Sequence, residues 1–201
     1  RKFIFSTNIN NANCTPVGNL SFGDGFQLFQ IGDINNNTGE GGPGYEDFTN
    51  LSTNIEQGSS NDLTVTTGYG NQYIRVWIDY NDDFVFSLDE LVVDNYVIAP
   101  GAAAGSFTET MQLDVAEDAT LGEHIMRAKS NWNAPVPDDA CEETQYGETE
   151  DYRVNIVESL GLDNSVLGSS EFKILSLDNN QFNVSLSTLY NQDISFSVYN
   201  V

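Results

Sequence analysis

Short runs of alternating apolar and polar residues constrain the fold of this chain of 201 residues most strongly. The runs are rich in aromatic and β-branched side chains, and Gly, Asn, Asp and Ser separate them at the spacing expected of packed sheets. No stretch shows a helical period of useful length. The pattern therefore predicts an all-β fold, an antiparallel β-sandwich of jelly-roll or immunoglobulin-like form, with strands at residues 62–67, 73–78, 90–97, 106–115, 122–129 and 152–157.

The character of the sequence changes after residue 157. Residues 158–171 are typical of a linker, because they are short of apolar residues and hold Gly, Asn, Asp and Ser. Three further strands are predicted beyond it, too few for an independent domain, at residues 172–177, 181–186 and 193–199. We therefore expect a sandwich over residues 1–157 and a partial small β-sandwich over residues 172–201.

The charge of the chain excludes several partners. Asp and Glu total 30 against 7 Lys and Arg, which gives a formal net charge of −23. Such a chain is repelled by nucleic-acid phosphate and by anionic membrane surfaces, so we expect it to bind neither. No apolar run approaches the roughly 18 residues of a transmembrane helix, so no transmembrane segment is expected. A bound divalent cation would relieve the self-repulsion of the folded chain.

One loop has the spacing of calcium ligands. From Asp79 to Glu90 the residues at positions 1, 3, 5, 7, 9 and 12 match the EF-hand pattern of oxygen donors, although Phe84 occupies position 6, where glycine is usual. Strands are predicted on both sides, so this would be a calcium loop in a β-hairpin. The alternative is an acidic turn that bonds only its own backbone. The predicted Ca²⁺ ligands are Asp79, Asn81, Asp83, the carbonyl of Val85, Ser87 and Glu90.

Two other acidic stretches share an aromatic-flanked form. Residues 146–152 read Tyr-Gly-Glu-Thr-Glu-Asp-Tyr, and residues 45–48 read Tyr-Glu-Asp-Phe. In an extended strand Glu148 and Glu150 lie on one face, where two carboxylates repel unless a cation, a donor or solvent relieves them. We interpret Glu148, Glu150 and Asp151 as a candidate second acidic site and both stretches as supports of the fold rather than catalysts.

Cys14 and Cys141 lie far apart, with neither a CxxC motif nor a nearby histidine to suggest zinc or redox chemistry. In an exported protein they would most simply form a disulfide, and two buried free thiols are the alternative. Closing a loop of that length would contribute about 4–5 kcal/mol in the chain-entropy model.

An enzyme is not expected from these residues. The sequence has no HExxH and no GxSxG motif, and its single histidine, His124, alternates onto the face of Met126 and Ala128. We interpret His124 as a packed side chain and not as a general base.

A binding module is the stronger alternative. Several aromatic residues could present faces to a glycan or a protein, and Trp132 is the preferred candidate because it lies in a loop-like stretch. Trp77, inside an alternating strand, is expected in the core. The remaining candidates are Tyr69, Tyr73 and Tyr146.

Four motifs occur in order along the chain, at residues 44–48, 76–83, 126–128 and 146–152. Together they resemble the bacterial GEVED domain of secreted multidomain proteins of the Bacteroidetes, whose name motif reads Gly-Glu-Thr-Glu-Asp here. The resemblance covers roughly residues 13–157. It implies an extracellular β-sandwich accessory domain, of a kind found beside proteases, glycan-active enzymes and adhesins.

Residues 172–201 resemble the opening strands of a type IX secretion C-terminal sorting domain. This resemblance implies recognition by the outer-membrane secretion machinery, export across the outer membrane, and a secreted or cell-surface location. We therefore expect a non-catalytic accessory or adhesion module, stabilised by Ca²⁺, with glycans or surface proteins as further partners. The alternative is a carbohydrate-binding or enzyme-associated domain.

Overall fold

The computed structural model describes residues 14–39, 41–159, 171–177 and 181–187, with backbone only for the last two ranges. The chain divides into two compact units, Arg1–Ser159 and Leu160–Val201. In the described residues the first unit is built from strands, with a single 3-10 turn, η1. Its elements are β1 (Phe26–Ile31), β2 (Ile34–Asn36), β3 (Tyr45–Glu56), β4 (Ser60–Tyr69), β5 (Gln72–Ile78), η1 (Leu88–Glu90), β6 (Leu91–Ile98), β7 (Ala104–Asp114), β8 (Gly122–Trp132) and β9 (Thr149–Val157).

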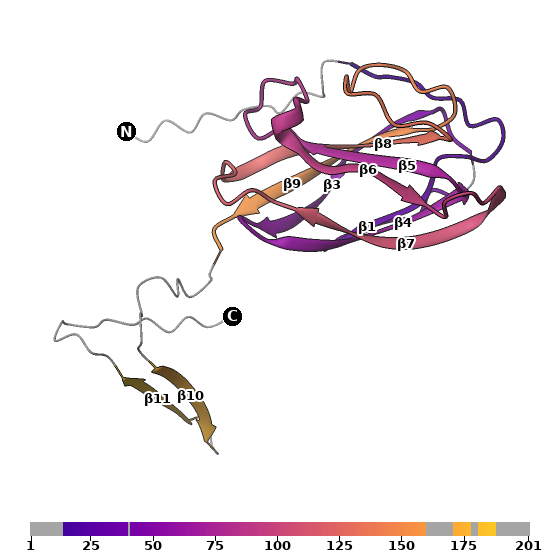
Figure 1. Ribbon diagram of the computed structural model, residues 1–201. Helices are drawn as coiled ribbons and strands as arrows, with labels where there is room; N and C mark the ends of the chain where they lie inside the picture. The colour runs from indigo at the N-terminus through magenta and orange to yellow at the C-terminus, as the bar shows by residue number, and fades with distance from the viewer. Residues whose placement is uncertain (1–13, 40, 160–170, 178–180, 188–201) are drawn as a thin grey trace. The chain divides into compact units, whose positions relative to one another are not determined.

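These strands form two packed sheets, which Figure 1 shows as two layers. One sheet has four strands in the order β2-β1-β4-β7, and the other has five in the order β3-β9-β8-β5-β6. The chain passes from the second sheet to the first at Pro100-Gly101, where Gly101 has a φ of 77°. The predicted all-β sandwich is therefore confirmed, but its pairing is not wholly antiparallel, because β3 and β9 run parallel.

The main core lies between the sheets. Side chains alternate along each strand, so Ile74, Val76 and Ile78 of β5 face the core together with Met126 and Ala128 of β8. Residues that are paired across neighbouring strands point to the same face of the sheet. The core-facing side chains of β8 are therefore continued by their partners in β9. Burial of these apolar side chains is the main stabilising term of the fold.

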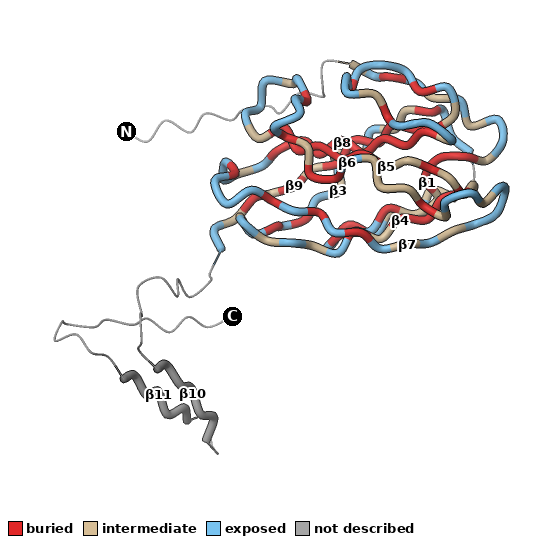
Figure 2. Tube along the Cα trace, in the orientation of Figure 1, coloured by how far each residue is buried: buried red, intermediate tan, exposed pale blue. Residues whose placement is uncertain are grey.

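The outer face of the five-stranded sheet is also covered. Strands β5 and β8 are buried at nearly every position, as the red segments in Figure 2 show. Loops 79–90 and 133–148 cover this face with a second apolar cluster that contains Trp77, Phe86 and Ile125. Trp77 is fully buried, as predicted, but it packs beneath these loops and not between the sheets.

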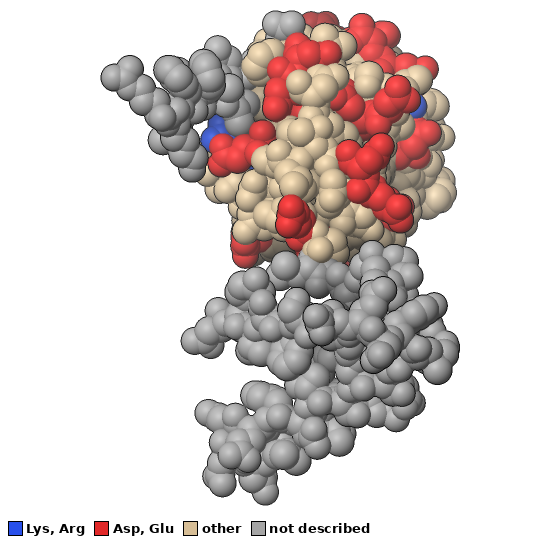
Figure 3. Space-filling model, turned by 90° about the vertical axis from the view of Figure 1, so that its left-hand side faces the viewer, with Lys and Arg blue, Asp and Glu red and all other residues tan. Residues whose placement is uncertain are grey.

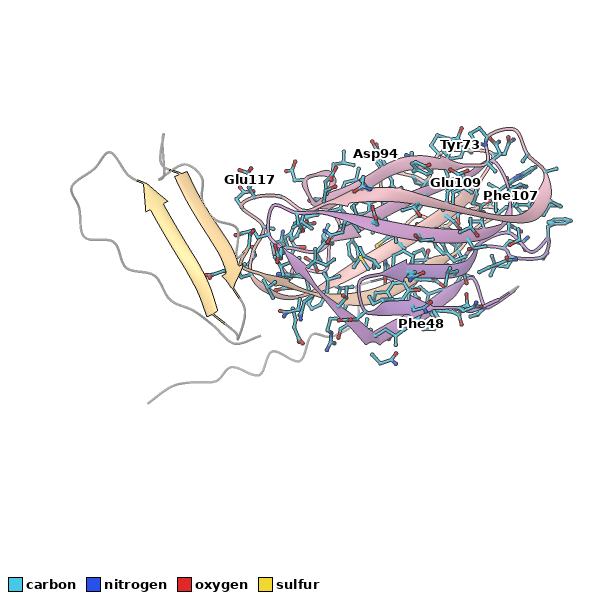
Figure 4. The ribbon with its side chains drawn as sticks, turned by 90° about the horizontal axis from the view of Figure 1, so that it is seen from below. Phe48, Tyr73, Asp94, Phe107, Glu109 and Glu117 are labelled. Atoms are coloured by element: carbon cyan, nitrogen blue, oxygen red, sulfur yellow. A yellow bond between two sulfur atoms is a disulfide. The ribbon has the colours of Figure 1, made fainter. Side chains whose placement is uncertain are left out.

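All six strands predicted for the first unit are present, and each predicted end lies within three residues of the observed end; the largest differences are the last residue of β8 and the first residue of β9. The sequence did not predict β1, β2 or β3. The ladder between β1 and β4 shifts register near Phe26 and Leu28, which interrupts the alternation of apolar residues in β1. Strand β3 is an edge strand rich in polar residues, and its Phe48 packs against the core (Figure 4). An edge strand needs no continuous apolar face, so its signal in the sequence is weak.

The described part of the second unit is an antiparallel pair, β10 (Glu171–Leu177) with β11 (Gln181–Ser187). Both strands were predicted. The third predicted strand, residues 193–199, and most of the predicted linker lie outside the described residues. Within the described residues, no helix is long and apolar enough to cross a membrane.

Candidate functional site

Loop 79–90 connects β5 to β6 within one sheet, as the hairpin interpretation predicted. Asp79 follows β5 directly, and its backbone N–H donates to the carbonyl of Ile125 on β8 (2.9 Å). Its side chain is only 1% exposed. The first predicted calcium ligand is therefore attached firmly to the sheet, while Asn81 and Asp83 lie on the exposed part of the loop.

Backbone N–H groups inside the loop converge on its side-chain oxygens. The carboxylate of Asp79 accepts from the N–H groups of Asp83 (3.2 Å) and Phe84 (2.9 Å). Asn81 accepts from Asp83 (2.8 Å), and Asp83 accepts from Val85 (2.8 Å). Successive contacts of this kind wind the loop tightly around Asp79.

Phe84 adopts the conformation that glycine usually provides. Its φ is 65°, in the left-handed region that non-glycine residues rarely occupy. The half-buried Phe84 side chain packs against the cluster of Trp77 and Phe86, which offsets the strain of this backbone conformation. The departure from glycine therefore preserves the sharp turn.

Glu90 closes the loop from the other end. It is 4% exposed, and its Oε2 accepts from both the N–H (2.9 Å) and the hydroxyl (3.1 Å) of Ser87. Its Oε1 is buried and has no hydrogen-bond partner among the described residues. Burial raises the pKa of Asp79, and the charges of Glu90 and Asp82 raise it further. Two buried carboxyls whose charges repel one another are unfavourable as anions unless a cation joins them.

His124 holds the loop from β8. The Nδ1 atom of His124 lies 3.0 Å from Oδ1 of Asp82, and its Nε2 lies 2.8 Å from the carbonyl of Thr120. The side chain is buried and shares the face of Met126 and Ala128. This placement agrees with the interpretation of His124 as a packed residue with a structural role.

The Gly-Glu-Thr-Glu-Asp motif, residues 147–151, divides its side chains between two faces of the sheet. A Cβ on Gly147 would lie 2.0 Å from the carbonyl oxygen of Ser130, so only glycine permits this approach to β8. Glu150 pairs with Ala128 and therefore faces the sandwich interior, whereas Asp151 pairs with Arg127 and faces outward. Of the predicted second acidic site, Glu148 and Glu150 come together, and Asp151 lies apart from them.

Glu46 takes the place predicted for Asp151. The parallel ladder of β3 and β9 sets Glu46 beside Glu150, and one carboxylate oxygen from each of Glu46, Glu148 and Glu150 lies within 4.8 Å of the others. We refer to these three residues as the glutamate cluster. The signal was present in the sequence, because residues 45–48 repeat the aromatic-flanked acidic form of residues 146–152. Only the register reveals that the two stretches meet.

Burial dominates the electrostatics of the glutamate cluster. Burial raises the pKa of Glu148 to about 8. The hydrogen bond from the N–H of Phe26 opposes this shift, and the charges of Glu46 and Asp24 add to it. Burial also raises the pKa of Glu150 well above its usual range, and the charge of Glu148 adds to the effect. Burial therefore disfavours the ionised form of both carboxyls unless a cation is bound beside them.

Asp151 belongs to a buried ion pair. Both of its oxygens accept from Arg127, at 2.8 Å each, in the bidentate geometry that a guanidinium favours. Arg127 also donates to the carbonyl of Cys14 (2.8 Å) and stacks over the ring of Phe86. Cys14 is joined to Cys141 by the disulfide that the sequence predicted. This assembly holds the 133–148 loop on the sheet and is structural.

Trp132 is the last residue of β8 and lines a pocket of about 260 Å³. Its ring makes edge-to-face contacts with Tyr69 and Tyr146, and Tyr146 in turn contacts Phe22. The structure therefore gathers three of the five aromatic residues considered from sequence, while Tyr73 and Trp77 belong to the second apolar cluster.

Two of the residues that line this pocket, Asp24 and Trp132, also carry buried polar atoms. Asp24 is buried, and neither of its oxygens has a hydrogen-bond partner among the described residues. The Nε1 atom of Trp132 is buried and equally without a partner. An aromatic pocket with polar groups beside it has the composition of sites for polar ligands such as a sugar or a side chain.

No curated protein matches the chain. A protein-family comparison does identify part of it. The matched segment, residues 73–155, includes most of β5, loop 79–90, β6, β7, β8, the 147–151 motif and most of β9. Residues 73–155 match the family model of the GEVED domain.

Proposed function

We propose that the chain is a non-catalytic extracellular accessory or adhesion module that Ca²⁺ stabilises through loop 79–90. The family match supports a GEVED module. Figure 3 shows Asp and Glu side chains spread over the visible face of the first unit. A surface of this charge attracts divalent cations. The observation that carries the proposal is the buried Oε1 of Glu90, which has no hydrogen-bond partner among the described residues, in a loop with EF-hand spacing around the buried Asp79. The donors are all hard oxygens, which suit Ca²⁺.

Thermal unfolding with excess calcium and with chelator tests this proposal. Calcium at a hundredfold excess over its dissociation constant stabilises a one-site protein by about 2.7 kcal/mol. We expect Asp79→Ala and Glu90→Ala each to reduce the calcium-induced stabilisation by about this amount, because each removes a ligand. Asp89→Ala is the matched control, since Asp89 is exposed and outside the ligand pattern. A calcium response that is equal in all four proteins would identify the loop as an acidic turn only.

A carbohydrate-binding or protein-binding role is the second candidate, and the pocket at Trp132 favours it. We expect Trp132→Ala to lose retention on immobilised glycans or surface proteins by at least about tenfold, since a buried aromatic anchor commonly contributes more than about 1.4 kcal/mol. Tyr73→Ala serves as the control, because Tyr73 lies outside the pocket. Unchanged retention of the Trp132 variant would remove this candidate.

We also propose export by the type IX secretion system to the cell surface or medium. The support is the resemblance of residues 172–201 to the start of a sorting domain, together with the disulfide, which is typical of exported proteins. Export of a chain that lacks residues 172–201 would contradict this proposal. The lack of catalytic motifs and the structural role of His124 support a module without enzymatic activity.

A further inference from the structure

We propose that the glutamate cluster, Glu46, Glu148 and Glu150, is a second calcium site, inside the sandwich and separate from loop 79–90. The cluster lies at the parallel junction of β3 and β9, which run side by side in Figure 1. Glu148 and Glu150 are 1% and 0% exposed. Solvent therefore cannot neutralise them, and three carboxylates within 4.8 Å need a counter-charge from elsewhere.

No protein cation supplies that charge among the residues whose side chains the structure describes. Arg127 and Lys129 lie on the opposite face of β8, where Arg127 pairs with Asp151 and Lys129 donates to the carbonyls of Ala140 and Glu142. The other two described Lys and Arg side chains are also engaged elsewhere. Arg75 pairs with Asp94 and Asp138, and Arg153 lies 3.8 Å from Glu123.

The cluster has free oxygen atoms in a fixed arrangement. In Glu148, Oε2 accepts from the N–H of Phe26 (2.9 Å), and in Glu150, Oε2 accepts from the hydroxyl of Tyr152 (2.7 Å). In both residues Oε1 is buried and has no hydrogen-bond partner among the described residues. Each carboxylate is thus oriented by one oxygen and keeps the other for a ligand, which is the arrangement that supports a metal site.

Glycine keeps the space beside these oxygens open. A Cβ on Gly42 would lie 3.2 Å from Oε1 of Glu148 and 3.3 Å from Oε2 of Glu46. A Cβ on Gly25 would lie 2.8 Å from Oε2 of Glu148. Side chains at either position would therefore crowd the cluster. Within the described part of the chain, neither oxygen of the neighbouring Asp24 has a hydrogen-bond partner, and its charge acts on Glu148, which makes this end of the sandwich still more attractive to a cation.

The donor set selects the kind of ion. Among the described residues the cluster contains carboxylates only and neither histidine nor cysteine, which excludes the nitrogen and sulfur donors that zinc prefers. Carboxylate oxygens suit Ca²⁺ and Mg²⁺, and Ca²⁺ accepts the irregular geometry that two strands and a loop impose more readily than Mg²⁺ does. The alternative to a bound ion is a proton shared between the carboxyls of Glu46 and Glu148, and we call this the competing state.

Calcium titration by calorimetry of the full chain, after removal of metal with chelator, tests this inference. We expect the double variant Glu148→Gln/Glu150→Gln to bind one calcium equivalent fewer than the parent chain, because glutamine keeps the shape of each side chain but removes its charge. Glu142→Gln/Glu143→Gln is the matched control, since both residues are exposed, and it should bind as the parent does. The loop variant Asp79→Ala/Glu90→Ala should retain the cluster's equivalent, so failure of the loop site and failure of the cluster are distinguished.

A second measurement detects the competing state and controls for folding. At pH 8 with chelator, the Glu148→Gln/Glu150→Gln variant should unfold at a higher temperature than the parent chain, because glutamine needs neither the protons nor the cation that these buried carboxyls require. Added calcium should raise the midpoint of the parent by more than that of the variant. An equal calcium response and an equal stoichiometry in the two proteins would overturn the inference and assign the cluster to proton binding alone.

Discussion

Replacing Arg127 with methionine is expected to lower the free energy of unfolding by about 3–5 kcal/mol, the usual cost of breaking a buried ion pair. Both partners are buried, and the two hydrogen bonds from Arg127 to Asp151 are each 2.8 Å long. Without the guanidinium, the carboxylate of Asp151 keeps only the hydroxyl of Tyr45 as a donor among the described contacts. Urea unfolding, followed by tryptophan fluorescence, measures the effect.

Arg75→Met provides the matched comparison. Arg75 is also buried, but its acidic partners Asp94 and Asp138 are 63% and 74% exposed, and Figure 4 shows Asp94 at the surface. Water can solvate these carboxylates after the substitution, so we expect a loss of only about 1 kcal/mol. Adding Asp151→Asn to Arg127→Met should restore part of the stability, because it removes the unpaired charge. Equal losses for Arg75→Met and Arg127→Met would contradict this account of the buried pair.

Removing the disulfide is expected to be similarly destabilising. Cys14 and Cys141 are 127 residues apart, so the bond closes most of the first unit into one loop. In the chain-entropy model such a closure contributes about 4–5 kcal/mol by restricting the unfolded chain. The double variant Cys14→Ser/Cys141→Ser should therefore unfold at a markedly lower urea concentration than the oxidised parent.

Reductant supplies the control for this second prediction. It should shift the unfolding midpoint of the parent chain towards that of the double variant and leave the variant unchanged. The two large effects should also be coupled, because Arg127 donates to the carbonyl of Cys14 and contacts its sulfur. A reduced parent as stable as the oxidised one would show that the disulfide contributes little to folding.

Local patterns explain which parts of the fold could be predicted from sequence. Strands β5 and β8 carry apolar residues at alternating positions, and in places on both faces. Loop 79–90 holds its candidate ligands within twelve consecutive positions. Both signals are complete within a short stretch, so no knowledge of distant contacts is needed to find them. The acidic composition likewise led to the prediction of a bound cation before any fold was known.

Contacts between distant segments could not be predicted in the same way. The sequence contained both acidic stretches, but the parallel pairing of β3 with β9 is what brings Glu46 to Glu150, and pairing between non-consecutive strands leaves no local pattern. Trp132 was expected in a loop, yet it ends β8, and its pocket requires side chains from three other parts of the chain.

The sequence by itself determined the all-β class and the strand-flanked acidic loop, and it favoured a disulfide between the two cysteines over two free thiols. The tertiary structure alone decided which face each acidic side chain occupies. Because side chains alternate along a strand, the register of β9 against β8 sends Asp151 to Arg127 and Glu150 into the interior. A shift of one residue would exchange those environments, and the free energy that prevents the shift comes from packing across both faces of the sheet.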